Sequence, residues 1–126
     1  NPNSIAQKAA VEAMLGPQDF RDQMLSEYRL RRDFALGRLR AMPGVSCHEP
    51  KGAFYLYPDI REVLARKRMR DGMEFANELL RRHAVAIVPG EAFGTPGYIR
   101  ITFAVSMRVL ERGLDRFERF ISEQAE

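Results

Sequence analysis

The sequence predicts an α/β protein of the α+β kind, in which a small mixed or antiparallel sheet is covered mainly by helices. Helical apolar periodicity occupies both ends of the chain, while short strand-like segments lie between them. The resulting order of elements, α-α-β-β-α-β-β-α, is typical of a helix-covered sheet. A chain of 126 residues, 45% of them hydrophobic, can bury one core. We therefore expect a single compact body with a long N-terminal helix.

The first 43 residues predict two helices. Asn3 or Ser4 can cap a short helix that runs to about Leu15, and Gly16-Pro17 supplies a stop and a restart. A second helix is predicted to reach about Met42, because apolar side chains recur at helical spacing, namely at Phe20, Met24, Tyr28, Ala35 and Leu39. At ~1.5 Å per residue this helix is about 40 Å long. A core of this size needs a shorter helix to cover it. We therefore expect part of the second helix to pack against something outside the chain.

The middle of the chain predicts two short strands. Residues 45–48 and 52–57 are rich in strand-forming side chains and are separated by Glu49-Pro50-Lys51. The second segment is apolar on both faces, which predicts that it is central in the sheet.

The second half predicts a helix, two strands and a final helix. Asp71 and Glu74 form a capping-box pair that opens a helix, whose inner face carries Phe75, Leu79 and Leu80. Residues 85–88 form a brief β-branched strand ended by Pro89-Gly90, and residues 98–104 form the clearest strand. Ser106 caps the last helix, whose apolar stripe consists of Leu110, Leu114, Phe117 and Ile121.

One arginine, Arg100, stands in the middle of the strand predicted over residues 98–104. Strand alternation places Ile99, Ile101 and Phe103 on one face, and Tyr98, Arg100 and Thr102 on the other. The residues alone leave two interpretations open. Either the second face meets solvent, or it borders a cleft where the two-pronged guanidinium receives a carboxylate. The loop before the strand, with three glycines and two prolines, is of a kind that often borders binding sites.

Charge and hydropathy limit the classes of partner that we expect for this chain. The chain has 20 basic and 17 acidic residues, a formal charge of +3, and basic groups scattered through helical patterns, so we expect no nucleic-acid partner. Residues 61–70 carry five basic side chains but no aromatic platforms, and we expect a solvated loop or helix face there. The sequence contains neither an apolar run of about 20 residues nor a signal-peptide layout, so we expect no membrane partner.

The cysteine and histidines predict no metal site and no thiol catalysis. Cys47 is the only cysteine, which precludes an internal disulfide and favours a reducing, cytoplasmic location. Cys47 and His48 are neighbours on a predicted strand and so point to opposite faces. His83 lies far along the chain at the end of a predicted helix, where a cation suits the helix dipole.

Three segments carry a resemblance to a known family. They are "NPNSIAQKAAVEAM" at residues 1–14, "PKGAFYLYPDI" at 50–60 and "PGEAFGTPGYIRITFA" at 89–104. In order and spacing they resemble the C-terminal part of pyridoxal-phosphate-dependent fold type I aminotransferases, the class I/II, aspartate aminotransferase-like group. The resemblance covers nearly the whole chain. It implies that residues 1–16 end a large-domain segment, 17–43 form the interdomain helix and 44–126 form the small domain.

The resemblance also implies a function. In the family, the arginine at the position of Arg100 holds the α-carboxylate of the substrate, and the segment at Gly52, Ala53 and Phe54 approaches the substrate side chain. Residues 1–4 resemble a loop near the dimer interface, although a helix cap alone also explains them. Packing in a core strand likewise remains an alternative for 52–54. The implied enzyme is a cytoplasmic homodimer of amino acid metabolism that uses pyridoxal 5'-phosphate to exchange an amino group between a 2-amino acid and a 2-oxo acid.

Other parts of the family's active site have no counterpart in this sequence. The Schiff-base lysine of the family lies upstream of the first segment, and Lys8, Lys51 and Lys67 stand in unrelated contexts. We therefore expect no catalytic and no cofactor-binding residue here, and an inactive chain when it is isolated. The absence of an initiating methionine suggests a piece of a longer polypeptide. The alternative function is a stand-alone α/β interaction or nucleic-acid-binding module without catalysis.

Overall fold

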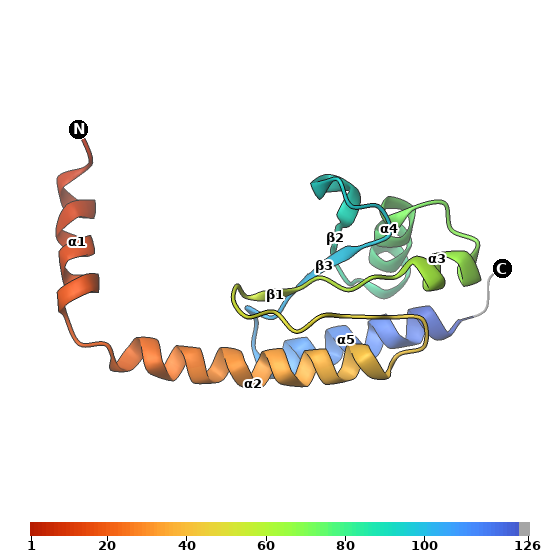
Figure 1. The fold of residues 1–126 in the computed structure, drawn as a ribbon, viewed down its shortest axis with the longest axis horizontal. Coiled ribbons are helices and arrows are strands. Elements are labelled where there is room, and N and C mark those ends of the chain that lie inside the picture. The colour runs from red at the N-terminus through yellow and green to blue at the C-terminus, as the bar shows by residue number, and fades with distance from the viewer. Residues whose placement is uncertain (124–126) are drawn as a thin grey trace.

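The computed structural model describes residues 1–123, which form five α-helices, one short 3-10 helix and a small sheet (Figure 1). In chain order, the elements are α1 (Ser4–Leu15), α2 (Asp19–Ala41), β1 (Tyr55–Leu56), α3 (Arg61–Lys67), α4 (Gly72–His83), β2 (Val88–Pro89), η1 (Gly90–Phe93), β3 (Ile99–Thr102) and α5 (Met107–Ser122). The predicted α+β class is confirmed.

The sheet is antiparallel, and its strand order is β1-β3-β2. Tyr55 pairs with Thr102 across β1 and β3, while Val88 pairs with Arg100 across β2 and β3. The prediction that residues 52–57 form the central strand is wrong, because β3 takes that place and β1 lies at an edge. The outward side chain Tyr55 is 37% exposed, so this face of β1 has no second layer of helices over it.

All four predicted strands are shorter than the sequence indicates, since the segment 52–57 is reduced to β1 and the segment 98–104 to β3. Residues 45–48 contribute only an isolated bridge, in which Ser46 and Asp59 exchange backbone hydrogen bonds of 3.1 and 2.8 Å. Residues 85–87 precede β2 and are not part of it. Val85 and Ile87 instead pack their side chains against the core. The β-branched pattern therefore reports burial at these positions, and not strand pairing.

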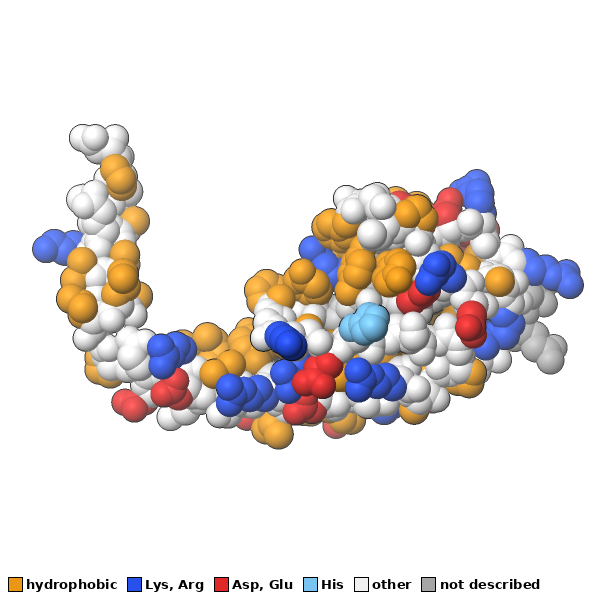
Figure 2. Space-filling view, in the orientation of Figure 1, with side chains coloured by type: hydrophobic (Ala, Val, Ile, Leu, Met, Phe, Trp, Pro, Cys, Tyr) orange, Lys and Arg blue, Asp and Glu red, His pale blue; other side chains and the backbone are white. Residues whose placement is uncertain are grey.

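The two N-terminal helices differ in what they contact. Asn3 caps α1 as predicted, accepting hydrogen bonds from the N–H groups of Ile5 and Ala6. No residue of α1, which lies wholly within the described range, is buried. This helix stands clear of the rest of the molecule at the N-terminal end of α2, with apolar side chains visible along it (Figures 1 and 2).

The apolar stripe of α2 is buried along its second half only. Ala35 and Leu39 are fully buried, whereas Phe20 is 73% exposed and Met24 is 41% exposed. Helices α2 and α5 run side by side beneath the sheet (Figure 1). The N-terminal half of α2 therefore extends past the core that the described residues form.

The core lies where α2, α4, α5 and the sheet meet. Its largest fully buried side chains are Phe75, Phe103, Phe117 and Phe120. The predicted stripe of α5 is confirmed, since Leu110, Leu114, Phe117 and Ile121 are all buried. Ser106 caps this helix by accepting from the N–H of Val109.

Helix α4 begins with the predicted cap, but with a different second bond. Asp71 accepts from the N–H of Glu74 at 2.8 Å, whereas the Glu74 carboxylate accepts from the N–H of Arg70 at 2.8 Å and not from that of Asp71. The assignment of Leu80 to the inner face is wrong, because this side chain is 53% exposed. Buried positions follow i, i+3, i+4, i+7 from Gly72, and Leu80 falls one residue beyond that stripe.

The basic segment 61–70 begins with the short helix α3, whose side chains bind backbone groups of other elements. The Lys67 ammonium is buried and donates to the carbonyls of Phe120 at 2.8 Å and Glu123 at 3.0 Å. Arg66 donates to the carbonyls of Pro43 and Ile121. The expectation of a solvated segment is therefore wrong for Lys67, because the carbonyls at the C-terminal end of α5, where a helix lacks intrahelical donors, attract this cation. In the described residues, no helix is long and apolar enough to cross a membrane.

Candidate functional site

Arg100 projects from β3, the central strand of the sheet. The predicted alternation holds, since Ile99 and Phe103 are buried on one face while Arg100 is half-buried on the other. Because Tyr55 pairs directly with Thr102, two residues from Arg100, the register places Tyr55 and Arg100 on the same face of the sheet.

Aromatic rings, and no carboxylate, surround the Arg100 guanidinium. Its central carbon lies 4.8 Å from the ring centre of Phe93 and 5.6 Å from that of Tyr55. Within the described part of the chain, this guanidinium makes no ion pair and no hydrogen bond. By contrast, Arg38 contacts two carboxylates, Asp115 and Glu118, which raise its pKa above the ordinary value through hydrogen bonds. Arg100 is therefore a cation whose counter-ion these residues do not supply.

An open pocket lies beside this cation. We call it the Arg100 pocket, and its lining residues are Tyr55, Tyr57, Phe93, Thr95 and Arg100. The Tyr57 ring stacks on that of Tyr98 at 5.5 Å, and its hydroxyl is hydrogen-bonded to the Thr95 hydroxyl. A fixed cation beside aromatic rings and hydroxyl groups suits a small organic anion, because a guanidinium matches a carboxylate with two parallel donors.

The loop that supplies Phe93 and Thr95 is tightly built. The N–H of Gly90 donates to the Tyr98 carbonyl at 2.7 Å, and the N–H of Thr95 donates to the Gly90 carbonyl at 3.0 Å. A side-chain carbon on Gly90 would lie 2.2 Å from the Thr95 carbonyl oxygen, so only glycine fits there. Gly94 has a φ of 72°, in the left-handed region that favours glycine. These constraints fix where Phe93 stands relative to β3.

Residues 52–54, expected to line a side-chain pocket, form an exposed bend before β1 and not part of the strand. Ala53 has a φ of 62°, and a side-chain carbon on Gly52 would meet open space. Phe54 is 56% exposed, and its carbonyl accepts from the N–H of Phe103 at 2.9 Å. The Phe54 ring lies 6.4 Å from that of Tyr55, which in turn contacts Arg100. The bend thus adjoins the Arg100 pocket through Tyr55.

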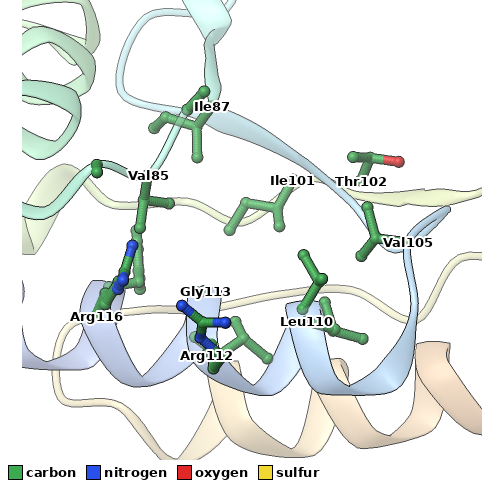
Figure 3. Close-up of a pocket in the computed structure, with 14 residues that line it drawn as sticks. Val85, Ile87, Ile101, Thr102, Val105, Leu110, Arg112, Gly113 and Arg116 are labelled. Carbon is green, nitrogen blue, oxygen red and sulfur yellow. The ribbon is translucent and has the colours of Figure 1, made fainter.

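A second cavity, of about 390 Å³, lies between residues 84–87, β3 and α5. Figure 3 shows Val85, Ile87 and Ile101 facing Leu110 on α5, with Arg112 and Arg116 beside them. Its described lining has no acidic side chain, no histidine and no cysteine. Because Ile101 lies on the face opposite to Arg100, this cavity is separate from the Arg100 pocket. Its described lining offers no acid–base pair.

Neither Cys47 nor either histidine lines one of the two cavities. The Cys47 thiol is buried beside the His48 carbonyl, at 3.5 Å, and burial raises its pKa, so the reactive thiolate is disfavoured. His83 Nε2 lies 3.0 Å from a carboxylate oxygen of Glu123 at the end of α5. No group of three or more His, Cys, Asp or Glu side chains among residues 1–123 is arranged to hold a metal ion.

Comparison with known proteins shows which family shares this sequence and fold. The family model described as aminotransferase class I and II matches residues 3–117. The chain belongs to this family. The resemblance found in the three sequence segments is thereby confirmed, and the fold type I aminotransferase architecture accounts for the long helix and the small sheet.

Individual aminotransferases agree over nearly the whole chain. The aspartate aminotransferase of Geobacillus stearothermophilus is 41% identical over 99% of this chain and 32% of its own length. The crystal structure of the aspartate aminotransferase from Rhizobium meliloti superposes with a TM-score of 0.90 at 36% identity, covering 98% of this chain and 32% of that one. The alanine aminotransferase from Pyrococcus furiosus also gives 0.90, at 34% identity, covering 98% of this chain and 31% of that one. The chain therefore spans about a third of the length of these relatives.

This aminotransferase chain contains three lysines, the side-chain type to which pyridoxal-phosphate enzymes attach their cofactor. Lys8 and Lys51 are exposed, and the Lys67 ammonium is buried against two backbone carbonyls. None of the described residues that line the Arg100 pocket is a lysine. The Arg100 pocket therefore contains a cation without a counter-ion among the described residues, and no lysine amine.

Sequence reasoning identified Arg100 but missed its neighbours Phe93, Tyr55, Tyr57 and Thr95. A partial signal existed for the two tyrosines, since residues 55 and 57 alternate with the apolar Leu56. Their approach to Arg100 depends on the β1–β3 register, which pattern alone does not specify. For Phe93 no periodic signal exists, because it lies in an irregular loop.

Proposed function

We propose that this chain acts as part of a pyridoxal-phosphate-dependent aminotransferase that exchanges an amino group between a 2-amino acid and a 2-oxo acid. The observation that carries the proposal is the Arg100 guanidinium, held in an aromatic pocket without a counter-ion among residues 1–123, in a chain of this family. A site of this kind leaves room for the charge of a substrate carboxylate.

In this proposal, residues 1–16 belong to a large-domain segment, 17–43 to an interdomain helix and 44–126 to the small domain. The exposure along α1 and the first half of α2 supports this division. Ile5, Met14 and Leu15 are each about 80% exposed, and Phe20 is 73% exposed. Apolar side chains gathered along two successive helices are typical of a surface that another body covers.

Arg100 is proposed to bind the α-carboxylate, and Gly52, Ala53 and Phe54 to border the substrate side chain. The guanidinium orients the substrate by two parallel N–H donors, which fixes the bound molecule at one end. The open space at Gly52 and the exposed ring of Phe54 leave room for a side chain next to Tyr55. Since named relatives act on aspartate or alanine, these two amino acids are the first donors to test.

Pyridoxal 5'-phosphate, the proposed cofactor, supplies an electron sink for the bond changes at the substrate α-carbon. The residues that attach it are proposed to come from the part of the enzyme outside this chain.

We also propose a cytoplasmic homodimer that serves amino acid metabolism. The single cysteine, which cannot form an internal disulfide, suits a reducing compartment. The family match favours this enzyme over a stand-alone interaction or nucleic-acid-binding module.

The test compares two proteins. A protein of the relatives' full length that contains this segment is assayed for amino transfer from L-aspartate and from L-alanine to 2-oxoglutarate. The 126-residue chain is incubated with pyridoxal phosphate and treated with borohydride. We expect transfer by the former, and no stoichiometric adduct on one lysine of the latter. Absence of transfer with every donor, or specific trapping coupled to turnover on Lys8, Lys51 or Lys67, contradicts the proposal.

A further inference from the structure

We propose that Phe93 is a positioning residue for Arg100, holding the guanidinium by its face so that its edge is presented to the substrate carboxylate. This inference rests on the proposed function, which assigns the carboxylate to Arg100. It adds a residue from the irregular loop to the binding machinery.

The geometry of the pair carries the argument. The Arg100 guanidinium carbon lies 4.8 Å from the Phe93 ring centre, which is within the distance at which a cation is attracted to an aromatic face. Guanidinium groups stack on rings by their planar faces, while their N–H donors point outward in the plane. A ring contact and a two-pronged carboxylate contact therefore use different parts of the same group.

The aromatic rings are the only groups that hold the Arg100 head within residues 1–123. It has no hydrogen-bond acceptor and no acidic partner there, and the second ring, Tyr55, lies further away at 5.6 Å. A long side chain without such contacts samples many rotamers, and ordering it on binding opposes affinity. Phe93 reduces that cost by ordering the side chain before the substrate arrives.

Phe93 is itself held in place, although its side chain is 49% exposed. It ends η1, and the following Gly94 donates its N–H to the carbonyl of Glu91 at 3.1 Å. The Phe93 ring meets that of Tyr57 edge-on at 6.2 Å, and Tyr57 stacks on Tyr98. An exposed aromatic ring with this much support is suited to hold a partner in a defined position.

The chain contains a matched control. On α2, the Arg38 guanidinium lies 5.9 Å from the Phe34 ring, but hydrogen bonds to Asp115 and Glu118 already hold it. Phe34→Leu therefore removes a ring from an arginine that lies outside the proposed site.

The experiment uses the full-length enzyme and measures kcat and KM for L-aspartate, together with Kd for succinate by calorimetry. Phe93→Leu and Phe93→Met keep the approximate volume and remove the ring, while Phe93→Tyr keeps the ring. We expect the first two to raise KM and the succinate Kd by about 2- to 30-fold, with a smaller change in kcat. Phe93→Tyr and Phe34→Leu should stay within about twofold of wild type.

Arg100→Lys and Arg100→Gln distinguish a failure of the proposed function from a failure of the positioning role of Phe93. If both keep the wild-type kcat/KM, the proposed function is wrong. If they lose activity while Phe93→Leu and Phe93→Met keep wild-type KM and Kd, only the positioning role is overturned. It is also overturned if Phe93→Tyr loses as much as Phe93→Leu, since the ring then contributes nothing. Thermal melting and cofactor content identify any variant that fails to fold, in which case the other ring-free variant decides.

Discussion

The N–H of Gly72 donates a 2.8 Å hydrogen bond to Oε1 of Glu91, which joins the first turn of α4 to the loop that carries Phe93. The other oxygen of this carboxylate is buried without a hydrogen-bond partner among the described residues. A negative charge is favourable at a helix N-terminus, where backbone N–H groups have no intrahelical acceptor. The wall of the Arg100 pocket is therefore anchored to a helix that does not line it.

Glu91→Ala should reveal this anchor. The substitution leaves the Gly72 N–H without its acceptor, and we expect a loss of about 1–2 kcal/mol in the free energy of unfolding. Urea denaturation measures the loss. Glu111, exposed on α5, provides the control, since Glu111→Ala should change stability by less than about 0.5 kcal/mol. Equal stabilities of the two variants would show that the contact does not hold the loop.

Two glycines should respond in opposite ways to alanine. At Gly90 a new side-chain carbon would lie 2.2 Å from the Thr95 carbonyl oxygen and 2.7 Å from that of Tyr98, and both are backbone atoms that cannot move aside cheaply. We expect Gly90→Ala to cost about 1–3 kcal/mol or more. At Gly113, inside α5, a new side-chain carbon meets nothing within 4 Å, so Gly113→Ala should stabilise the protein by about 0.5–1 kcal/mol. Thermal or urea unfolding of both variants tests the pair, and a stabilised Gly90→Ala contradicts it.

Four of the five α-helices in the described residues were predictable because their signals are local, whereas α3 falls in a segment expected to be a solvated loop or helix face. Ser106 and Asp71 cap helices at the positions where the sequence indicates, and the stripe of α5 is buried throughout. Periodicity reports an amphipathic face wherever the partner surface is large enough to cover it. Leu80 shows the limit of this reasoning, because its exposure depends on where the partner surface of α4 ends.

The sheet and the site were less predictable because they depend on distant contacts. An apolar pattern placed residues 52–57 in the centre, yet β1 lies at an edge, with Tyr55 turned toward Arg100. A strand's position in a sheet is set by pairing with residues far along the chain, which composition does not encode. The meeting of Phe93 with Arg100 further depends on loop geometry around Gly90 and Gly94.

Asp59 should give the protein an acid-sensitive component of stability. The Arg61 side chain donates to its carboxylate at 3.0 Å, and this hydrogen bond holds the pKa of Asp59 below its usual range. Because the folded pKa is lower than the unfolded one, the stabilisation is complete above about pH 4 and is lost as the pH falls through the folded pKa. Urea midpoints between pH 6 and pH 3 should therefore fall less for Asp59→Asn, and for Arg61→Met, than for wild type. Parallel pH dependence in all three would contradict the assignment.

Helix α1 should be stable only when another surface covers it. None of its described residues is buried, and an isolated helix of 12 residues is marginal in water. In the 126-residue chain, we expect its amide hydrogens to exchange at rates near those of an unfolded peptide, while those of α5 are protected. In the full-length protein the same amides should become protected under the proposed large domain. Equal exchange of α1 in both proteins would contradict the proposed division at residue 16.

Substitution of Arg100 in the full-length enzyme tests the proposed site most directly. If this side chain binds the substrate carboxylate in a partly dry cleft, Arg100→Gln leaves that carboxylate imperfectly paired. Loss of one partner of a buried charge pair typically costs about 2–5 kcal/mol, which corresponds to roughly 30- to several-thousand-fold in kcat/KM. Arg100→Lys should recover only part of this loss, because an ammonium is a point charge and cannot reproduce the two-pronged contact.

Cofactor content distinguishes a local effect from a general one. Pyridoxal phosphate in both variants should remain near the wild-type level, since the described residues around Arg100 include no lysine that could attach it. If Arg100 merely faces solvent, stability should change by less than about 0.5 kcal/mol and the rate hardly at all. Measurement of kcat/KM with L-aspartate for wild type, Arg100→Lys and Arg100→Gln therefore decides between the two interpretations of this strand. Three similar values would mean that the guanidinium stacks on Phe93 without serving a substrate, because a bound carboxylate cannot lose its charged partner without a loss of affinity.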